Sequence, residues 1–184
     1  MSRQRIEYAD DDTESVGRLA RLRLPSLAIG LVLGVVLSFV TSRFEQVLTQ
    51  DIKIAFFIPF IVYMADAVGT QTQDIYVRDL RTGKASFRKY LVKETALGFI
   101  FGLLASVGSA IVTYVWFGSP AITLTISASM FGAVLVAPLV SLLIIQLLKR
   151  ERVDPAAGSG PIATIVQDTL SILIFGFIAS AILL

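Results

Sequence analysis

The sequence predicts an all-α membrane protein with five transmembrane helices. Of its 184 residues, 55% are hydrophobic and 16% are charged, whereas a soluble domain carries roughly a quarter charged residues. The apolar residues stand in continuous blocks, and a helix needs about 20 such residues to cross a bilayer. Cysteine and histidine are absent, which removes thiol nucleophiles and the commonest general base at neutral pH. These observations exclude a soluble enzyme.

Four spans follow directly from the apolar blocks. The first block ends at a polar Thr-Ser-Arg group, and a Gly-Ser-Pro turn separates the third block from the fourth. The fifth block continues to the last residue of the chain. These four predicted spans are approximately Leu24–Val40, Ala96–Phe117, Ala121–Leu148 and Pro161–Leu184.

The second span is unusual, because its purely apolar part is too short to cross a membrane. That part runs from Ile54 to Ala65, and a polar segment from Asp66 to Asp74 follows it. A membrane helix tolerates polar side chains where they face the protein interior or water. We therefore expect the polar half of this helix to lie inside the protein or along an aqueous path.

Positive charge predicts the orientation of the chain. Of the 16 Lys and Arg residues, only Arg43 and Lys53 fall on one side of a five-span topology. Cytoplasmic loops carry the excess of basic residues, so we expect a cytoplasmic N-terminus and an extracytoplasmic C-terminus in a plasma (inner) membrane. Residues 1–23 then form a cytoplasmic tail with acidic and basic parts, and residues 24–184 form the membrane domain. We interpret the basic loops as anchors to membrane lipids and expect no nucleic-acid partner.

The fifth span carries a carboxylate, Asp168, at a depth where a charge is costly. A carboxylate near the centre of a span costs about 2.5–3.5 kcal/mol on insertion scales. Thr164, Asp168 and Ser171 follow the spacing i, i+4, i+7, which places them on one face of a helix. We therefore expect a polar stripe on an otherwise apolar helix.

A matching stripe lies in the second span, where Asp66, Thr70 and Gln73 have the same spacing. Two such stripes on two helices would together line a wet path for cations. The alternative is polar packing between helices, with each Asp protonated or paired. Because no Lys or Arg lies deep in a span to neutralise the two acids, we favour the cation path.

Asp154 and Pro155 open the approach to the fifth span. Asp154 fits a helix N-cap with Pro at the first helical position, and the glycines that follow suggest a flexible bend. A second interpretation places the Asp154 carboxylate at the cytoplasmic mouth of the path, where it would concentrate cations. The sequence leaves both interpretations open.

These motifs resemble those of the MgtE-type magnesium transporters. The segment from Asp154 to Asp168, with its Asp-Pro-Ala start and its Ser-Gly-Pro turn, is similar to the last transmembrane helix of that family. The residues that make the second span similar to the family's second helix are Pro59, Met64, Gly69, Thr70, Gln71, Val77 and Arg78. The resemblance covers residues 24–184.

The resemblance implies a homodimer of five-helix protomers, with an ion path at the dimer interface lined by helices two and five. It implies that Asp168 is the pore carboxylate and that Asp154 is the Asp of the family's cytoplasmic motif. Asp66 stands beside the position of a family Asn, and we expect it to be a third metal-binding residue. Residues 1–23 are too short for the family's cytoplasmic domains, which leaves the gating mechanism open. The expected pore-lining residues are Thr164, Ser171, Thr70, Gln73 and Gly69.

The function that these observations favour is a divalent cation channel or transporter. Mg²⁺ is the expected ion, and oxygen ligands also suit Mn²⁺ or Co²⁺. One alternative is a carrier coupled to Na⁺ or H⁺, and another is a membrane scaffold subunit that transports nothing. We do not expect an enzyme: only Asp66 and Asp168 could form a catalytic dyad, and neither is followed by the Gly that such a site would suggest.

Overall fold

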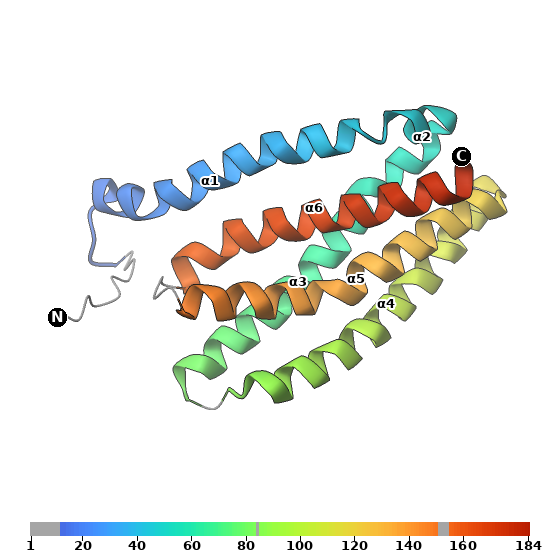
Figure 1. Cartoon of the computed structure of the whole chain (residues 1–184). Coiled ribbons are helices and arrows are strands. Elements are labelled where there is room, and N and C mark those ends of the chain that lie inside the picture. Colours follow the sequence, from blue (N-terminus) through green and yellow to red (C-terminus); the bar gives the residue numbers. More distant parts are fainter. Residues whose placement is uncertain (1–11, 84, 151–154) are drawn as a thin grey trace.

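The computed structural model describes residues 12–83, 85–150 and 155–184, and all regular structure in these ranges is helical (Figure 1). Five of the helical segments are long and apolar enough to cross a membrane. This confirms the predicted all-α fold with five spans. The elements in chain order are α1 (Val16–Ser42), α2 (Glu45–Gln50), the 3-10 helix η1 (Ile52–Phe57), α3 (Ile58–Arg81), α4 (Phe87–Phe117), α5 (Pro120–Arg150) and α6 (Pro155–Leu183).

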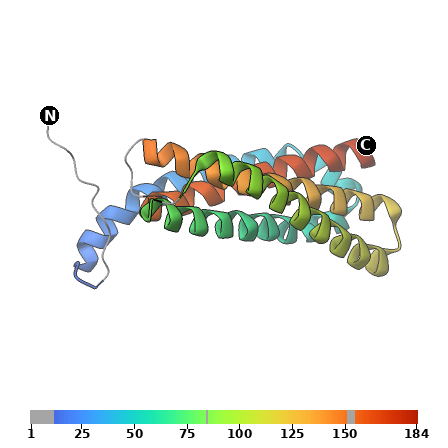
Figure 2. The ribbon, with the colours of Figure 1, turned by 90° about the horizontal axis from the view of Figure 1, so that it is seen from below.

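The long helices run along one another in a single bundle. Helix α1 begins at the end of the bundle that also holds the connection between α3 and α4, and α6 finishes at the opposite end (Figure 1). Figure 2 shows that the first turns of α1 extend beyond the ends of the other helices. We call the end with the α3–α4 connection the basic end, because Arg78, Arg81, Arg88 and Lys89 lie there. It is the end that the charge distribution predicts to be cytoplasmic.

Helix α5 forms the centre of the bundle and packs against α3, α4 and α6. Its sequence is apolar around most of its circumference, which is typical of a helix that is buried on several sides. Ile126, Met130 and Val134 are completely buried in the resulting core. The other spans are therefore positioned through their contacts with α5.

Two glycines let α4 approach α5 closely. A Cβ at Gly98 would lie 2.8 Å from the carbonyl oxygen of Leu135, and one at Gly102 would lie 3.1 Å from that of Phe131. Small residues spaced four apart are a common device for packing membrane helices at short distance. Pro138 also packs against Gly98, so the proline of α5 lies where the two helices are closest.

Helix α1 lies at the periphery of the bundle. It packs against α6, and none of its residues is buried. Its exposed side chains are largely apolar and include Leu31, Val35 and Phe39, which suits contact with lipid tails. The attachment is tightest just after the helix, where the ring of Phe44 fills the space beside Gly176 and leaves no room for a Cβ there.

Several helices begin earlier than hydropathy alone predicts. Helix α4 begins at Phe87, and α6 begins at Pro155, which occupies the first helical position as expected. The predicted flexible bend is wrong, because Gly158 and Gly160 lie inside α6. In a membrane a helix satisfies its backbone polar groups internally, and this favours continuing the helix over an open bend.

Candidate functional site

The two intramembrane aspartates lie on neighbouring helices. Asp66 belongs to α3 and Asp168 to α6, and these two helices pack against each other. Neither residue is exposed: both side chains are half-buried in the bundle. The structure thus packs together the two helices on which the sequence placed the acidic stripes.

Asp168 has an unsatisfied oxygen. Its Oδ1 atom is buried and has no hydrogen-bond partner among the described residues. Neither Asp168 nor Asp66 forms an ion pair within the part of the chain that the structure describes. A buried carboxylate without a donor or a counter-charge is unfavourable. A proton on Asp168, a bound cation or a hydrogen-bond donor from a second chain would each remove this unfavourable energy.

The threonines of the two stripes are exposed. Thr164 lies one turn before Asp168 on α6, and Thr70 lies one turn after Asp66 on α3. Neither hydroxyl makes a hydrogen bond within the described residues, whereas Thr169 of α6 donates to the carbonyl of Ile165 at 2.7 Å. Two hydroxyls beside the carboxylates are therefore available to water or to an ion's hydration shell.

Gln73 is half-buried in the third position of the α3 stripe. Two other residues expected on the path, Ser171 and Gly69, are buried. Ser171 is fully buried and accepts a hydrogen bond from Nε2 of Gln167 at 3.3 Å. Gly69 faces α5 so closely that a Cβ would lie 2.9 Å from Oγ of Ser141. Ser171 thus bonds within α6 and Gly69 packs against α5. Asp154 lies outside the described residues.

A buried carboxylate outside the two stripes, Glu94 of α4, was not predicted from the sequence. It is 8% exposed and accepts a 2.7 Å hydrogen bond from Oγ1 of Thr72. Because Glu94 directly follows Lys93, the sequence pattern places it in the charged connection that precedes the apolar part of the third span. The signal that identifies it is its spacing: Glu94, Gly98 and Gly102 recur every four residues and form the buried stripe of α4.

Gln167 also escaped sequence reasoning. It is 2% exposed, and its Nε2 atom lies 3.4 Å from the carbonyl oxygen of Ala133 in α5. Its Oε1 atom is buried without a hydrogen-bond partner among the described residues. A polar amide next to Asp168 therefore fixes this turn of α6 against α5.

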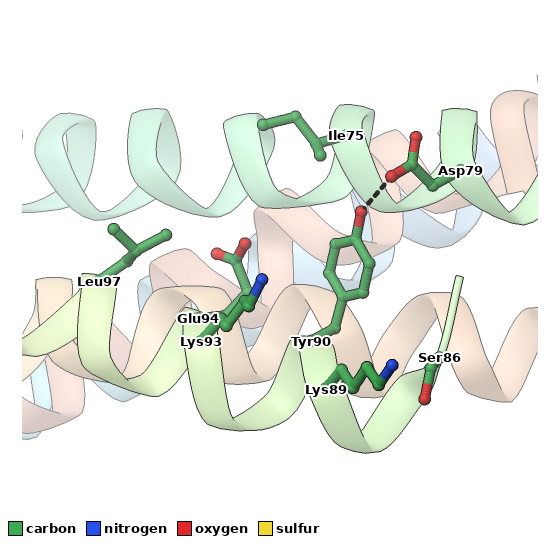
Figure 3. Close-up of a pocket in the computed structure, with 8 residues that line it drawn as sticks. All are labelled: Ile75, Asp79, Ser86, Lys89, Tyr90, Lys93, Glu94 and Leu97. Atoms are coloured by element: carbon green, nitrogen blue, oxygen red, sulfur yellow. Dashed lines mark hydrogen bonds between the residues drawn. The ribbon is translucent and has the colours of Figure 1, made fainter. Parts of the chain in front are cut away.

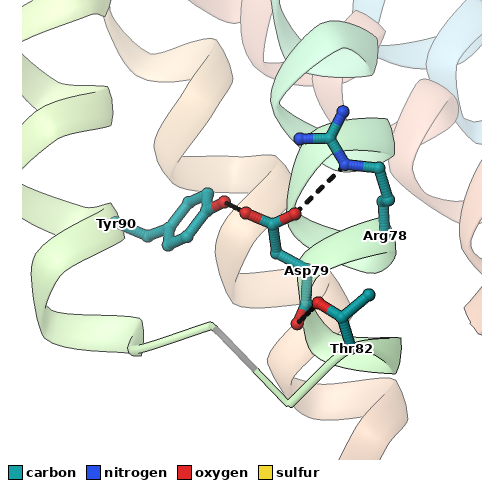
Figure 4. A network of polar contacts seen from close by, with 4 residues as sticks. All are labelled: Arg78, Asp79, Thr82 and Tyr90. Carbon is teal, nitrogen blue, oxygen red and sulfur yellow. Dashed lines mark hydrogen bonds and ion pairs between the residues drawn. The ribbon is translucent and has the colours of Figure 1, made fainter.

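A polar network joins α3 to α4 at the basic end (Figure 4). The hydroxyl of Tyr90 donates to Oδ2 of Asp79 at 2.5 Å, and Nε of Arg78 lies 3.1 Å from Oδ1 of the same carboxylate. Thr82 caps the end of α3 by donating to the Asp79 carbonyl at 3.1 Å. The network holds α3 and α4 together at the turn that connects them.

Comparison with known protein families identifies the family of the chain. A family model described as a divalent cation transporter, MgtE, matches residues 58–178. The match covers well over half of the chain and includes both Asp66 and Asp168. The chain belongs to the MgtE family. This confirms the resemblance drawn from the sequence motifs and agrees with a multi-pass membrane protein.

Three magnesium transporters named MgtE are similar to the chain over most of its length. The protein of Bacillus subtilis is 32% identical over 162 residues, which are 86% of this chain and 36% of that protein. The protein of Enterococcus faecalis is 30% identical over 93% of this chain and 38% of its own length. The protein of Thermus thermophilus is 30% identical over 90% of this chain and 37% of its own length. The chain therefore spans a little over a third of the length of these MgtE proteins.

Proposed function

We propose that this MgtE-family chain conducts hydrated Mg²⁺ through a carboxylate-lined path between two copies of the chain. The observation that carries the proposal is the buried, unpartnered Oδ1 of Asp168 on α6, a helix that packs against the helix carrying Asp66. A cation passing the two acids would supply the counter-charge that the described chain lacks. The three MgtE relatives, each described as a magnesium transporter, support Mg²⁺ as the ion.

The ligand chemistry favours a hydrated ion. Mg²⁺ prefers six oxygen ligands at about 2.0–2.1 Å and gives up its water reluctantly. Two carboxylates and a few hydroxyls do not replace six waters, but they accept and orient hydrogen bonds from them. Asp168 would supply charge, Asp66 would add to it, and the hydroxyls of Thr164 and Thr70 would contact the hydration shell.

A second copy of the chain would complete the path. Thr164 and Thr70 are exposed in one protomer and have no hydrogen bond within the described residues, an unfavourable arrangement against lipid. A homodimer that pairs α3 and α6 with their equivalents would cover both hydroxyls and would place each aspartate twice around the path. Such a site would hold four carboxylates for one divalent ion.

The membrane potential would drive the ion inward. It contributes about 2.3 kcal/mol per elementary charge per 100 mV, so about 4.6 kcal/mol per 100 mV for a divalent ion. The sequence contains no phosphate-binding loop motif for a nucleotide. Conduction down the electrochemical gradient is therefore the simplest mechanism.

The proposal is tested by flux into proteoliposomes that contain the purified full chain and a fluorescent Mg²⁺ indicator. Asp168→Asn keeps the shape of the side chain and removes its charge, and we expect it to reduce Mg²⁺ uptake to the background of empty vesicles. Glu45→Gln is the matched control, because Glu45 is an exposed carboxylate of α2, away from Asp168. Unchanged uptake by the Asp168 variant would refute the proposal.

The same assay separates the alternatives. A coupled carrier would take up Mg²⁺ only with an imposed Na⁺ or H⁺ gradient, whereas a channel would respond to the membrane potential alone. A scaffold subunit would give no flux from wild-type protein under either condition. Repeating the assay with Mn²⁺ and Co²⁺ would define the selectivity.

A further inference from the structure

A separate pocket of about 340 Å³ opens between α3 and α4 at the basic end (Figure 3). Its size is at the lower end of the roughly 300–1,000 Å³ that small-molecule sites occupy. Acidic and basic side chains meet in it: Asp79 from α3, and Lys89, Lys93 and Glu94 from α4. Both signs of charge are therefore available to one ligand.

The basic groups of this pocket are free to bind. Lys89 and Lys93 are both exposed, and neither forms an ion pair with any residue in the described ranges. Figure 3 shows Lys89 and Lys93 on α4, the helix that also carries Glu94. Two unpaired ammonium groups about one turn apart on a helix suit an anionic oxygen group such as a phosphate.

The acidic side of the pocket is more deeply set. Glu94 is almost fully buried, and Thr72 satisfies its Oε2 atom. Its other oxygen, Oε1, has no hydrogen bond within the described chain and is not sealed from the pocket. Asp79 is held in place by Tyr90 at the same wall. A ligand that carries only negative charge would meet these carboxylates and be repelled.

The pocket lies at the level of the bundle where the exposed surface of α4 changes from apolar to basic, which is the level expected for lipid headgroups. The exposed face of α4 is apolar from Leu97 onward, with Ile100 and Leu104 among its exposed residues. It becomes basic at Lys89 and Arg88. This change marks the boundary between the hydrocarbon core and the polar interface, where lysines reach towards phosphates. Ile75 and Leu97 line the apolar side of the pocket, on which an acyl chain can pack.

We propose that this pocket binds the headgroup of a phospholipid with a phosphoethanolamine group. The phosphate would lie against Lys89 and Lys93, and the primary ammonium would donate hydrogen bonds to Oε1 of Glu94. Phosphatidylglycerol lacks the cationic group and leaves the carboxylates unmatched. Phosphatidylcholine carries a cation, but its trimethylammonium group has no N–H to donate.

The test is native mass spectrometry of the purified full chain after equilibration with equal amounts of phosphatidylethanolamine, phosphatidylglycerol and phosphatidylcholine. Each spectrum reports the ratio of retained lipids within one sample, so a variant's lower yield does not affect it. For wild-type protein we expect phosphatidylethanolamine to exceed each of the others by about fivefold, the factor that corresponds to one well-placed charge at a membrane surface.

Three variants separate the pocket from general surface charge. Lys93→Gln should lower the fraction of the protein that retains any phospholipid, read from bound and free protein in the same spectrum, because it removes a contact to the phosphate that all three lipids carry. Glu94→Gln keeps the hydrogen bond from Thr72, and it should shift the preference from phosphatidylethanolamine towards phosphatidylglycerol. Arg88→Gln is the matched control, because Arg88 is exposed on the same helix and does not line the pocket.

Three outcomes would overturn the proposal. The first is a wild-type spectrum with the lipids in their bulk proportions. The second is an unchanged lipid preference in Glu94→Gln. The third is a loss in Arg88→Gln equal to that in Lys93→Gln, which would show that diffuse positive charge, and not the pocket, retains the lipid.

Discussion

Thr72 of α3 and Glu94 of α4 form a buried hydrogen bond in which the threonine hydroxyl donates to the carboxylate over 2.7 Å. The bond ties α4 to the helix that carries Asp66, six residues earlier in the chain. Six residues of helix rise by about 9 Å, so the fixed point lies close to the proposed ion path. A buried polar contact between two spans thereby helps to set the position of an intramembrane acid.

Removing the Thr72 hydroxyl should destabilise the protein. Thr72→Val has nearly the same shape and leaves Oε2 of Glu94 buried without its donor, which costs about 1–3 kcal/mol. We expect a lower apparent melting temperature in detergent, measured by the fluorescence of Trp116. Thr72→Ser retains a hydroxyl and is the control. Equal melting temperatures for the two variants would show that the hydrogen bond contributes nothing measurable.

Adding a methyl group at Gly98 should separate α4 from α5. The new Cβ would lie 2.8 Å from the backbone oxygen of Leu135, which cannot rotate away. Overpacking of this kind costs about 1–3 kcal/mol, so Gly98→Ala should lower the apparent melting temperature. Gly108→Ala in the same helix meets no atom within 4 Å, and we expect it to leave stability unchanged or raise it. The opposite ranking of the two variants would contradict the close α4–α5 contact.

Hydropathy and charge were sufficient to predict the five spans, because long apolar blocks have few alternatives in a membrane. They also drew attention to Asp168, because a carboxylate inside an apolar block is costly. Asp66 stood out because the second span reaches membrane length only if its polar half is included. Glu94 was missed for the opposite reason. It lies at the charged start of α4, where a hydropathy pattern does not distinguish a buried acid from a loop acid.

Helical spacing predicts the direction of a side chain but not the neighbour that it meets. Thr164 and Ser171 are seven residues apart and point to nearly the same side of α6, yet Thr164 is exposed and Ser171 is fully buried. Neighbouring helices cross, so the surroundings of one face change along its length. The sequence alone therefore does not predict that Thr164 is exposed and Ser171 is buried. That difference follows from the three-dimensional arrangement of α5 and α6.

The negative charge of Asp66 should strengthen the binding of the ion at Asp168. Asp66→Asn removes one negative charge near the unpartnered carboxyl group, and we expect the Mg²⁺ concentration for half-maximal flux to rise about tenfold, which corresponds to about 1.4 kcal/mol. Proteoliposome flux at graded Mg²⁺ concentrations measures this shift. An unchanged concentration for half-maximal flux in Asp66→Asn would mean that the charge of Asp66 does not act on the ion.

The two threonines of α6 provide a matched pair for the hydration-shell role. Thr164 makes no hydrogen bond within the described residues, whereas the Thr169 hydroxyl is already used by the Ile165 carbonyl. Valine at position 164 removes a group that we expect to contact the ion's water. A net hydrogen bond contributes about 0.5–1.5 kcal/mol, so Thr164→Val should reduce Mg²⁺ flux about twofold to tenfold.

Thr169→Val serves as the control for that change and should conduct like wild type, while Thr164→Ser should restore most of the flux by restoring the hydroxyl. All three variants keep both carboxylates, so a difference among them isolates the hydroxyl. Equal flux in the valine variants would mean that the ion's water does not contact Thr164. The path would then have to follow another side of α6, because a hydrated ion next to Asp168 on the Thr164 side would meet that hydroxyl one turn away.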